Sequence, residues 1–283
     1  MNLILLNPNQ FRPDGTAELT GRSADHVRSQ LHGAMGQRLR IGVLNGPRGT
    51  GTIQRITETA IELVCSLEPE PPPRPSMSLL LALPRPKVLK RLWAQLAALG
   101  LGRIYLCNAA KVERSYFDTH WLSPKHYEPL LIEGLEQAED TRLPEVRVIR
   151  RLKPFLEDEL AGLFPAEIRI LAHPASPNPH TPNQKTPQTA GDAGGPRFKT
   201  LSIFLEGRAP SRPSFSGGNP GPVASNQSTL LAVGPEGGWT DYELAMFEQL
   251  GFNRFSLGPR KLRSDTACLT LLGALMALVP GQT

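Results

Sequence analysis

Short apolar segments alternate with helical segments from residue 77 onward, and this alternation restricts the fold more than any other feature of the chain. Residues 77–83 form an almost continuous apolar run, which is typical of a strand buried on both faces. Residues 87–99 repeat apolar side chains at helical spacing and stop before Gly100. Further strands and helices are expected at 103–107, 124–138, 168–172, 229–233, 241–250, 253–257 and 265–278. The order predicts an α/β fold with a mostly parallel sheet and helices on its faces.

Residues 1–68 have a different pattern and are predicted to form a small, separate β-rich domain. Polar and apolar residues alternate there, as they do in half-buried strands. The strands are expected over 38–44, 51–56 and 60–65. Asn45-Gly46 follows the first of them and is a strong hairpin signal. A short helix is expected over 25–31 with Ser23 as its cap. Several short strands with one helix predict a barrel-like domain.

Proline accounts for 28 of the 283 residues, well above its usual ~5% share, and the excess marks two segments outside the expected cores. Residues 69–76 are predicted to be a stiff polyproline linker to a second domain over 77–283. Residues 175–228 are rich in Pro, Gly, Ser, Asn and Thr, and are predicted to be a disordered insertion. This insertion is either a surface loop or a lid over the site. Its apolar stretch 201–205 is either an added strand or a docking patch, if it is ordered at all.

Charge and cysteine usage exclude several classes of protein. The net charge of +5, from 31 basic and 26 acidic residues, fits an anionic partner such as RNA or a surface kept basic for solubility. The three cysteines are far apart, which argues against a disulfide scaffold and a clustered zinc site. No apolar run approaches the ~20 residues of a membrane span, and no signal peptide is visible. We therefore expect a soluble, cytoplasmic protein without membrane or metal.

Two glycine-proline loops, each between a strand and a helix, carry the most specific signal. Residues 233–239 read Val-Gly-Pro-Glu-Gly-Gly-Trp, and adjacent glycines permit positive φ and close approach of a ligand to the backbone. Residues 257–267 read Leu-Gly-Pro-Arg-Lys-Leu-Arg-Ser-Asp-Thr-Ala and hold three cations. Neither loop has the spacing of a dinucleotide-binding loop or a P-loop. Because both follow strands of an open sheet, they predict one ligand pocket at the strand ends.

Together the two loops resemble those of the RsmE family, the 16S ribosomal RNA (uracil-N3)-methyltransferases of the SPOUT superfamily. Weaker matches are the basic region of Arg85 and Lys87, Glu-Arg-Ser at 113–115, Glu-Gln at 136–137 and Ala-His-Pro at 172–174. They extend the resemblance over nearly the whole chain outside the insertion. The resemblance implies an N-terminal PUA-like β-barrel that binds RNA and a SPOUT α/β domain with a trefoil knot. It also implies a homodimer, for which the apolar helix after Asp265 is a candidate interface.

The resemblance further implies S-adenosylmethionine as cofactor and 16S ribosomal RNA of the small subunit as partner. The residues that match the cofactor site of the family are Ala172, His173, Gly234, Glu236, Gly237, Gly238, Leu257, Gly258, Leu262 and Arg263. Uracil N3 becomes a nucleophile only after losing a proton, and a guanidinium stabilises the anion that results. Arg263 is therefore the candidate catalytic residue, with a phosphate contact or an ion pair as its alternative role. Glu236 is either a general base or a loop residue that binds backbone.

An acid-free stretch over 71–112 contains seven basic residues, which suits contacts with phosphates. The alternative is a solvated basic face without a partner. The candidate RNA-binding residues are Arg28, Arg38, Arg85, Lys87, Lys90, Arg91 and Arg114. Another basic cluster, between 147 and 153, is expected in a solvated loop.

Three positions depart from the pattern of the family. Asp265 and Ala98 stand where a Glu is usual, and Asp140 stands where an Arg is usual. The changes at Ala98 and Asp140 are either one missing ion pair or the sign of a different RNA site. Two further functions therefore stay open: the same fold methylating another RNA, and a non-catalytic RNA-binding relative.

Overall fold

The structure is a computed structural model that describes residues 2–165, 168–173, 228–258 and 260–278. The chain divides into two compact units, each assembled from several segments. Unit 1 comprises Met1–Ser78, Arg85–Leu106 and Glu113–Val148, and unit 2 comprises Leu79–Pro84, Cys107–Val112 and Ile149–Thr283. The division into domains at 69–76 stays a prediction. The predicted insertion lies outside the described residues except for Ser228, and so does its 201–205 stretch.

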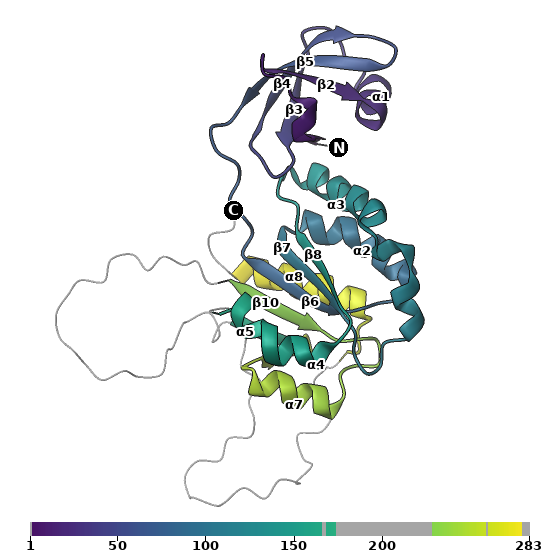
Figure 1. The fold of residues 1–283 in the computed structure, drawn as a ribbon, viewed down its shortest axis with the longest axis vertical. Helices are drawn as coiled ribbons and strands as arrows, with labels where there is room; N and C mark the ends of the chain where they lie inside the picture. Colours follow the sequence, from purple (N-terminus) through teal and green to yellow (C-terminus); the bar gives the residue numbers. More distant parts are fainter. Residues whose placement is uncertain (1, 166–167, 174–227, 259, 279–283) are drawn as a thin grey trace, which may run out of the picture. The chain divides into compact units, whose positions relative to one another are not determined.

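A curled five-stranded sheet forms the N-terminal part of unit 1 (Figure 1). Its strands are β1 (Ile4–Leu6), β2 (Thr16–Thr20), β3 (Arg38–Val43), β4 (Arg48–Ile56) and β5 (Ala60–Leu67), in the order β1-β3-β4-β5-β2. β1 pairs in parallel with β3, and the other neighbours are antiparallel. The inward side chains, among them Leu39, Ile41 and Leu63, form one buried cluster. The predicted barrel is thus a half-barrel with β1 and β2 at its edges.

The hairpin between β3 and β4 is confirmed, because Arg48 pairs with Gly42 and Asn45 adopts a φ of 60°. The predicted cap of the first helix is wrong. Helix α1 covers Gly21–Ser29, so Ser23 lies inside it, and the N-cap is Thr20. Gly21 has a φ of 54°, which turns the chain directly from β2 into the helix. The short 3-10 helix η1 (Pro8–Gln10) precedes β2.

A second sheet of six strands carries the α/β part of the chain. Its strands are β6 (Met77–Ala82), β7 (Leu101–Cys107), β8 (Glu145–Ile149), β9 (Ile168–Ala172), β10 (Thr229–Val233) and β11 (Asn253–Phe255), in the order β11-β9-β10-β6-β7-β8. β9 runs parallel to both β10 and β11. Every residue of β6 and β10 is buried, as their apolar sequences predict. The α/β prediction is confirmed, whereas the trefoil knot stays a prediction.

Two helices of unit 1, α2 (Pro86–Ala98) and α3 (Pro124–Ala138), pack side by side. Trp93 and Tyr127 meet across their interface with ring centroids 4.9 Å apart. A Cβ on Gly134 would collide with the backbone of Ala94, so glycine permits the close approach. Gly100 ends α2 with a φ of 69°, as expected for a glycine after a helix. The 3-10 helices η2 (Arg114–Asp118) and η3 (His120–Leu122) lead into α3.

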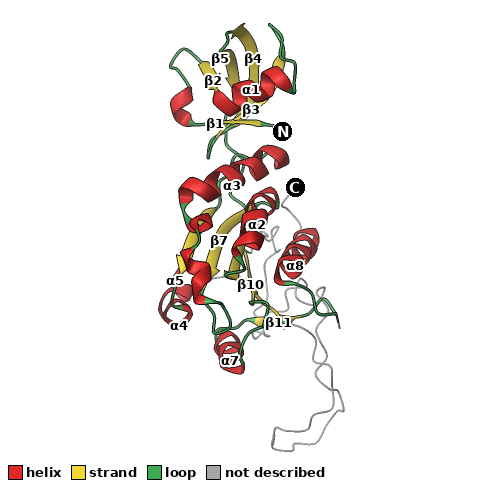
Figure 2. Ribbon diagram, turned by 90° about the vertical axis from the view of Figure 1, so that its right-hand side faces the viewer, coloured by secondary structure: helices red, strands yellow, loops and turns green. Residues whose placement is uncertain are grey.

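The helices of unit 2 lie on both sides of β10. Figure 2 shows α8 (Ser264–Leu278) on one side and α7 (Asp241–Gln249) with α4 (Leu152–Pro154) and α5 (Leu160–Leu163) on the other. A π-helical turn, η4 (Phe155–Glu159), joins α4 to α5. The solvated loop expected between 147 and 153 is shorter than predicted. Arg147 belongs to β8 and Lys153 to α4, and only the exposed Arg150 and Arg151 lie between these elements. None of the helices in the described residues is long and apolar enough to cross a membrane.

Candidate functional site

Three strands of unit 2 end side by side and bring the two glycine-proline loops together. Ala172, the last residue of β9, pairs with Phe255 of β11, while the preceding Leu171 pairs with Ala232 of β10. The next backbone N–H, that of His173, donates to the Phe255 carbonyl at 2.9 Å. The loops that follow β10 and β11 therefore start from the same edge of the sheet, as the sequence predicts.

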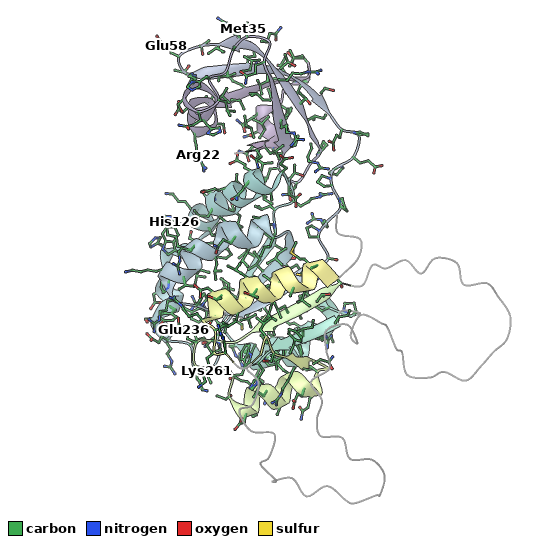
Figure 3. The ribbon with its side chains drawn as sticks, turned by 180° about the vertical axis from the view of Figure 1, so that it is seen from behind. Arg22, Met35, Glu58, His126, Glu236 and Lys261 are labelled. Atoms are coloured by element: carbon green, nitrogen blue, oxygen red, sulfur yellow. The ribbon has the colours of Figure 1, made fainter. Side chains whose placement is uncertain are left out.

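A cavity of about 380 Å³ opens between these loops. Nine of the ten residues predicted to hold the cofactor line it: Ala172, His173, Gly234, Glu236, Gly237, Gly238, Leu257, Gly258 and Leu262. Trp239, the last residue of the first glycine-proline loop, also lines it. Arg260 and Lys261 line it as well, although sequence reasoning gave these cations no part in the cofactor site. Figure 3 shows Lys261 and Glu236 at the same end of α8.

The first glycine loop has little room for side chains. The Gly238 N–H donates to the Pro235 carbonyl at 2.8 Å, and this bond closes a turn. Gly238 itself has a φ of 70°. A Cβ on Gly234 would lie 2.9 Å from Nε1 of the buried Trp239, and one on Gly237 would lie 3.0 Å from Cδ of Lys111. Packing thus favours glycine at 234, and conformation favours it at 238, while a side chain at 237 would have to displace the stem of Lys111.

The loop after β11 is fixed by a serine and a glycine. The Gly258 N–H donates to Ser256 Oγ at 3.1 Å, and that hydroxyl donates to the Gly258 carbonyl at the same distance. Gly258 has a φ of 114°, which strongly favours glycine. Leu257 and Leu262 remain about 40% exposed, and both face the cavity together with Leu271. This loop therefore gives the cavity an apolar wall.

Arg263 is the one predicted cofactor residue that does not line the cavity. Its side chain is 66% exposed, and its Nε lies 3.5 Å from Oδ1 of Asp265, which is 17% exposed. Its chain neighbours Leu262 and Ser264 both line the cavity. Arg263 thus directly precedes α8 between two lining residues, and it makes an ion pair, which is one of the alternative roles considered for it.

The segment after β7 also reaches the first glycine loop, which sequence reasoning missed. Lys111 donates from Nζ to the Gly237 carbonyl at 2.8 Å. The Ala110 N–H donates to Oε1 of the buried Glu243 at 2.8 Å. Glu243 and Thr240 also bond each other reciprocally in a capping box at the start of α7. The sequence shows the capping pattern, but it contains no signal for the contact with residues 110 and 111.

Most of the predicted RNA-binding residues are exposed and belong to unit 1. Arg85, Lys87, Lys90 and Arg91 lie at or on α2, Arg114 starts η2 and Arg38 lies on β3. Lys90 Nζ lies 4.8 Å from the ring centroid of Trp121. Arg28 is different, because it donates to the Thr57 carbonyl at 2.9 Å and to Asp25 at 3.1 Å within the N-terminal part. Its contacts favour a structural role for Arg28.

Asp140, one of the departures from the family pattern, has a local structural role. Its Oδ1 accepts the backbone N–H groups of Thr141 at 2.6 Å and Arg142 at 3.1 Å, just after the end of α3. An arginine has no acceptor that reproduces these bonds. The substitution is therefore accommodated by the turn itself.

These features define an α/β protein with a ligand site at the carboxyl ends of parallel strands. A family model described as an RNA methyltransferase domain matches residues 70–196 and 198–276. The ribosomal RNA small subunit methyltransferase E of Treponema pallidum is 26% identical over 280 residues, which cover 98% of this chain and 91% of that protein. The corresponding methyltransferase E 1 of Borreliella burgdorferi is 24% identical over 269 residues, which cover 95% of this chain and 94% of the relative.

Solved structures show the same fold. The ribosomal RNA small subunit methyltransferase E of Neisseria gonorrhoeae, bound to S-adenosylmethionine, matches with a TM-score of 0.67 and 17% identity and covers 98% of both chains. A putative methyltransferase of Legionella pneumophila, also in complex with S-adenosylmethionine, matches with a TM-score of 0.65 and 21% identity over 98% of this chain and 97% of that one. The chain belongs to the RsmE family of SPOUT RNA methyltransferases.

Proposed function

We propose that this protein methylates N3 of a uracil in 16S ribosomal RNA of the small subunit, using S-adenosylmethionine, in the cytoplasm. The observation that carries the proposal is the gathering of nine predicted cofactor residues, from three separate segments, around one cavity. The names of the relatives from Treponema pallidum and Borreliella burgdorferi support the small-subunit RNA as substrate. The choice of uracil N3 rests on the resemblance to the RsmE family.

The residues around the cavity fit S-adenosylmethionine. Glycines 237, 238 and 258 bring backbone to the wall of the cavity without a Cβ, which leaves room for a nucleoside to approach closely. Leu257, Leu262 and Leu271 supply apolar surface for its ring faces and methylene groups. Glu236 is an exposed carboxylate on the lining, and it would attract the positively charged end of the cofactor. When bound, the cofactor supplies an electrophilic methyl group.

The chain itself must hold the uracil and stabilise its deprotonated form. Once N3 loses its proton, negative charge spreads onto the two neighbouring carbonyl oxygens. Arg263 presents a permanently charged, exposed guanidinium beside the cavity, and Asp265 restrains it at one side. A guanidinium in that place lowers the energy of the anion more than that of neutral uracil, which is the requirement for catalysis.

RNA binding is proposed for the basic side chains of α2 and η2. Arg85, Lys87, Lys90, Arg91 and Arg114 are exposed, and α2 carries no acidic residue. Phosphate contacts of this kind release counterions, so the affinity for RNA should fall as salt is raised. Trp121, partly buried beneath Lys90, adds an aromatic surface of the kind that stacks unpaired bases.

The decisive experiment is nucleoside mass spectrometry of 16S ribosomal RNA from a strain that lacks the gene. We expect 3-methyluridine to disappear and to return when the wild-type gene is restored. Unchanged 3-methyluridine, with loss of another methylated nucleoside, would identify a different RNA target. Calorimetry with S-adenosylmethionine separates an enzyme from a non-catalytic RNA-binding relative, because only the enzyme requires cofactor binding.

We also propose that the protein is a homodimer that uses α8. This helix buries Cys268, Leu271, Leu272 and Leu275 within its own chain. Its exposed positions are small and recur every three or four residues: Thr266, Thr270, Gly273 and Ala277. A face of small side chains allows another helix to approach closely.

A further inference from the structure

Lys111 lies against the first glycine loop through both its ammonium group and its hydrocarbon stem. Its Nζ donates to the Gly237 carbonyl at 2.8 Å. A Cβ on Gly237 would lie 3.0 Å from Cδ and 3.4 Å from Cβ of Lys111, so the absence of a side chain at 237 gives the stem its place. The hydrogen bond and the contact together hold Lys111 beside the peptide group that follows Gly237.

That peptide group joins Gly237 to Gly238, and it is held from both sides. Its carbonyl accepts from Lys111, and its N–H, on Gly238, donates to the Pro235 carbonyl at 2.8 Å. Glycines on both sides leave little steric resistance to rotation of the peptide plane. The Lys111 bond therefore opposes a rotation that the sequence of the loop would otherwise allow.

Lys111 is itself presented by an anchored turn. The Val112 N–H donates to the Ala109 carbonyl at 3.0 Å, and both of these residues are buried. Between them, the Ala110 N–H donates to Oε1 of Glu243 at 2.8 Å. Oε2 of the same carboxylate accepts the N–H and the hydroxyl of Thr240, each at 2.8 Å. Glu243 thus ties the turn that carries Lys111 to the start of α7.

We propose that Lys111 and Glu243 are positioning residues that fix the Gly237–Gly238 peptide in the orientation that receives the cofactor. The proposal rests on the proposed function, since Gly237 and Gly238 line the cavity assigned to S-adenosylmethionine. A ligand that needs one loop conformation binds more weakly when that conformation is only fractionally populated. Removal of the clamp should therefore act on cofactor affinity before it acts on the chemical step.

The test compares Lys111→Met, which keeps the stem and removes the donor, with wild type. We expect the Kd and the KM for S-adenosylmethionine to rise about tenfold, the factor that corresponds to about 1.4 kcal/mol, with kcat at saturating cofactor nearly unchanged. Without cofactor, amide exchange in residues 234–239 should become faster. Lys111→Arg restores a donor and should recover part of the affinity.

Lys153→Ala is the matched control, because Lys153 is an exposed lysine of the same unit that pairs with Glu157 at 3.7 Å and does not line the cavity. It should leave exchange and affinity as in wild type. Unchanged exchange and unchanged cofactor affinity in Lys111→Met would overturn the proposal. So would a loss confined to RNA affinity, which would make Lys111 a phosphate contact. Absence of cofactor binding in wild type would instead refute the proposed function, while the exchange measurement still tests the clamp.

Discussion

The role proposed for Arg263 depends on its place next to the cavity-lining residues and on its contact with Asp265. It stands between two residues that line the cavity but does not line it, and its Nε lies 3.5 Å from the Asp265 carboxylate. The aspartate is a methylene shorter than the glutamate usual in the family, and its Oδ1 also accepts the Thr266 N–H at 3.0 Å. The guanidinium therefore has one side restrained and the remainder exposed, which suits it to an anion that forms only during the reaction.

Replacing Arg263 with alanine should lower kcat by about 10²–10³-fold, the usual loss when one group that stabilises an oxyanion is removed. The affinity for RNA should fall much less, because many phosphate contacts share it. Single-turnover methylation and filter binding measure the two quantities. Arg254→Ala, which removes an arginine paired with Glu248 at 2.7 Å on β11, is the control and should leave kcat unchanged. Equal losses of kcat and RNA affinity would make Arg263 a binding residue only.

Among the elements of unit 1, α3 is joined to β1 and the residues before it by hydrogen bonds to the backbone and the side chain of Glu136. The backbone carbonyl of Glu136 accepts the N–H of Leu3 at 3.0 Å and that of Asn2 at 3.2 Å. The side-chain Oε1 of Glu136 accepts the N–H of Leu5 at 3.3 Å. Asn2 also donates from Nδ2 to the Gln137 carbonyl at 3.0 Å. The Glu-Gln pair that resembles a family motif thus has a structural role in this chain.

The pH dependence of stability should report this junction. Burial raises the pKa of Glu136 above its ordinary value of 4.5, although the Leu5 N–H opposes the rise. The folded state then holds the proton more tightly than the unfolded state. The free energy of unfolding should consequently decrease as pH rises from 4.5 through the raised pKa.

Glu136→Gln keeps an oxygen acceptor for Leu5 and removes the titration, so this decrease should largely disappear. Urea unfolding at a series of pH values measures it. Glu133→Gln is the control on the same helix, where the exposed carboxylate lies 4.0 Å from Arg22. Identical pH profiles for wild type and Glu136→Gln would show that Glu136 does not titrate in this way.

At the scale of the whole molecule, the proposed dimer uses the side of α8 that the described residues leave exposed. A Cβ on Gly273 would meet no heavy atom within 4 Å, so a side chain there is compatible with the folded chain. In a dimer formed through α8, the same side chain would enter the interface.

If the proposed dimer forms through α8, Gly273→Arg should convert it to a monomer without unfolding the chain. Sedimentation velocity gives the oligomeric state, and circular dichroism checks the fold. Gly162→Arg is the matched control, because Gly162 lies in the α5 helix with nothing within 4 Å of a Cβ. A Gly273→Arg protein that stays dimeric would exclude this face, and a monomeric wild type would exclude the dimer.

The sequence predicted most elements of the α/β part because the spacing of apolar residues along a segment indicates which side of a strand or helix is buried. β10, α7 and α8 begin within one residue of their predicted starts. β1, with three residues, is too short to show a period. β8 was taken for part of a loop because its Arg147 belongs to a group of basic residues that continues beyond the strand. Ser23 was misplaced because the chain turns into α1 at Gly21, where the N-cap Thr20 makes no side-chain capping bond.

By itself the sequence determined the class of fold, the two loops and the residues that gather at the cavity, since each depends on local pattern or on a motif. Only the tertiary structure decided that Lys111 contacts Gly237, 126 residues away, and that Glu243 bonds Ala110. It also decided that Glu136 bonds Leu5 instead of solvent. Such contacts depend on how distant segments pack, and no periodicity within a segment records which backbone group will face a given side chain.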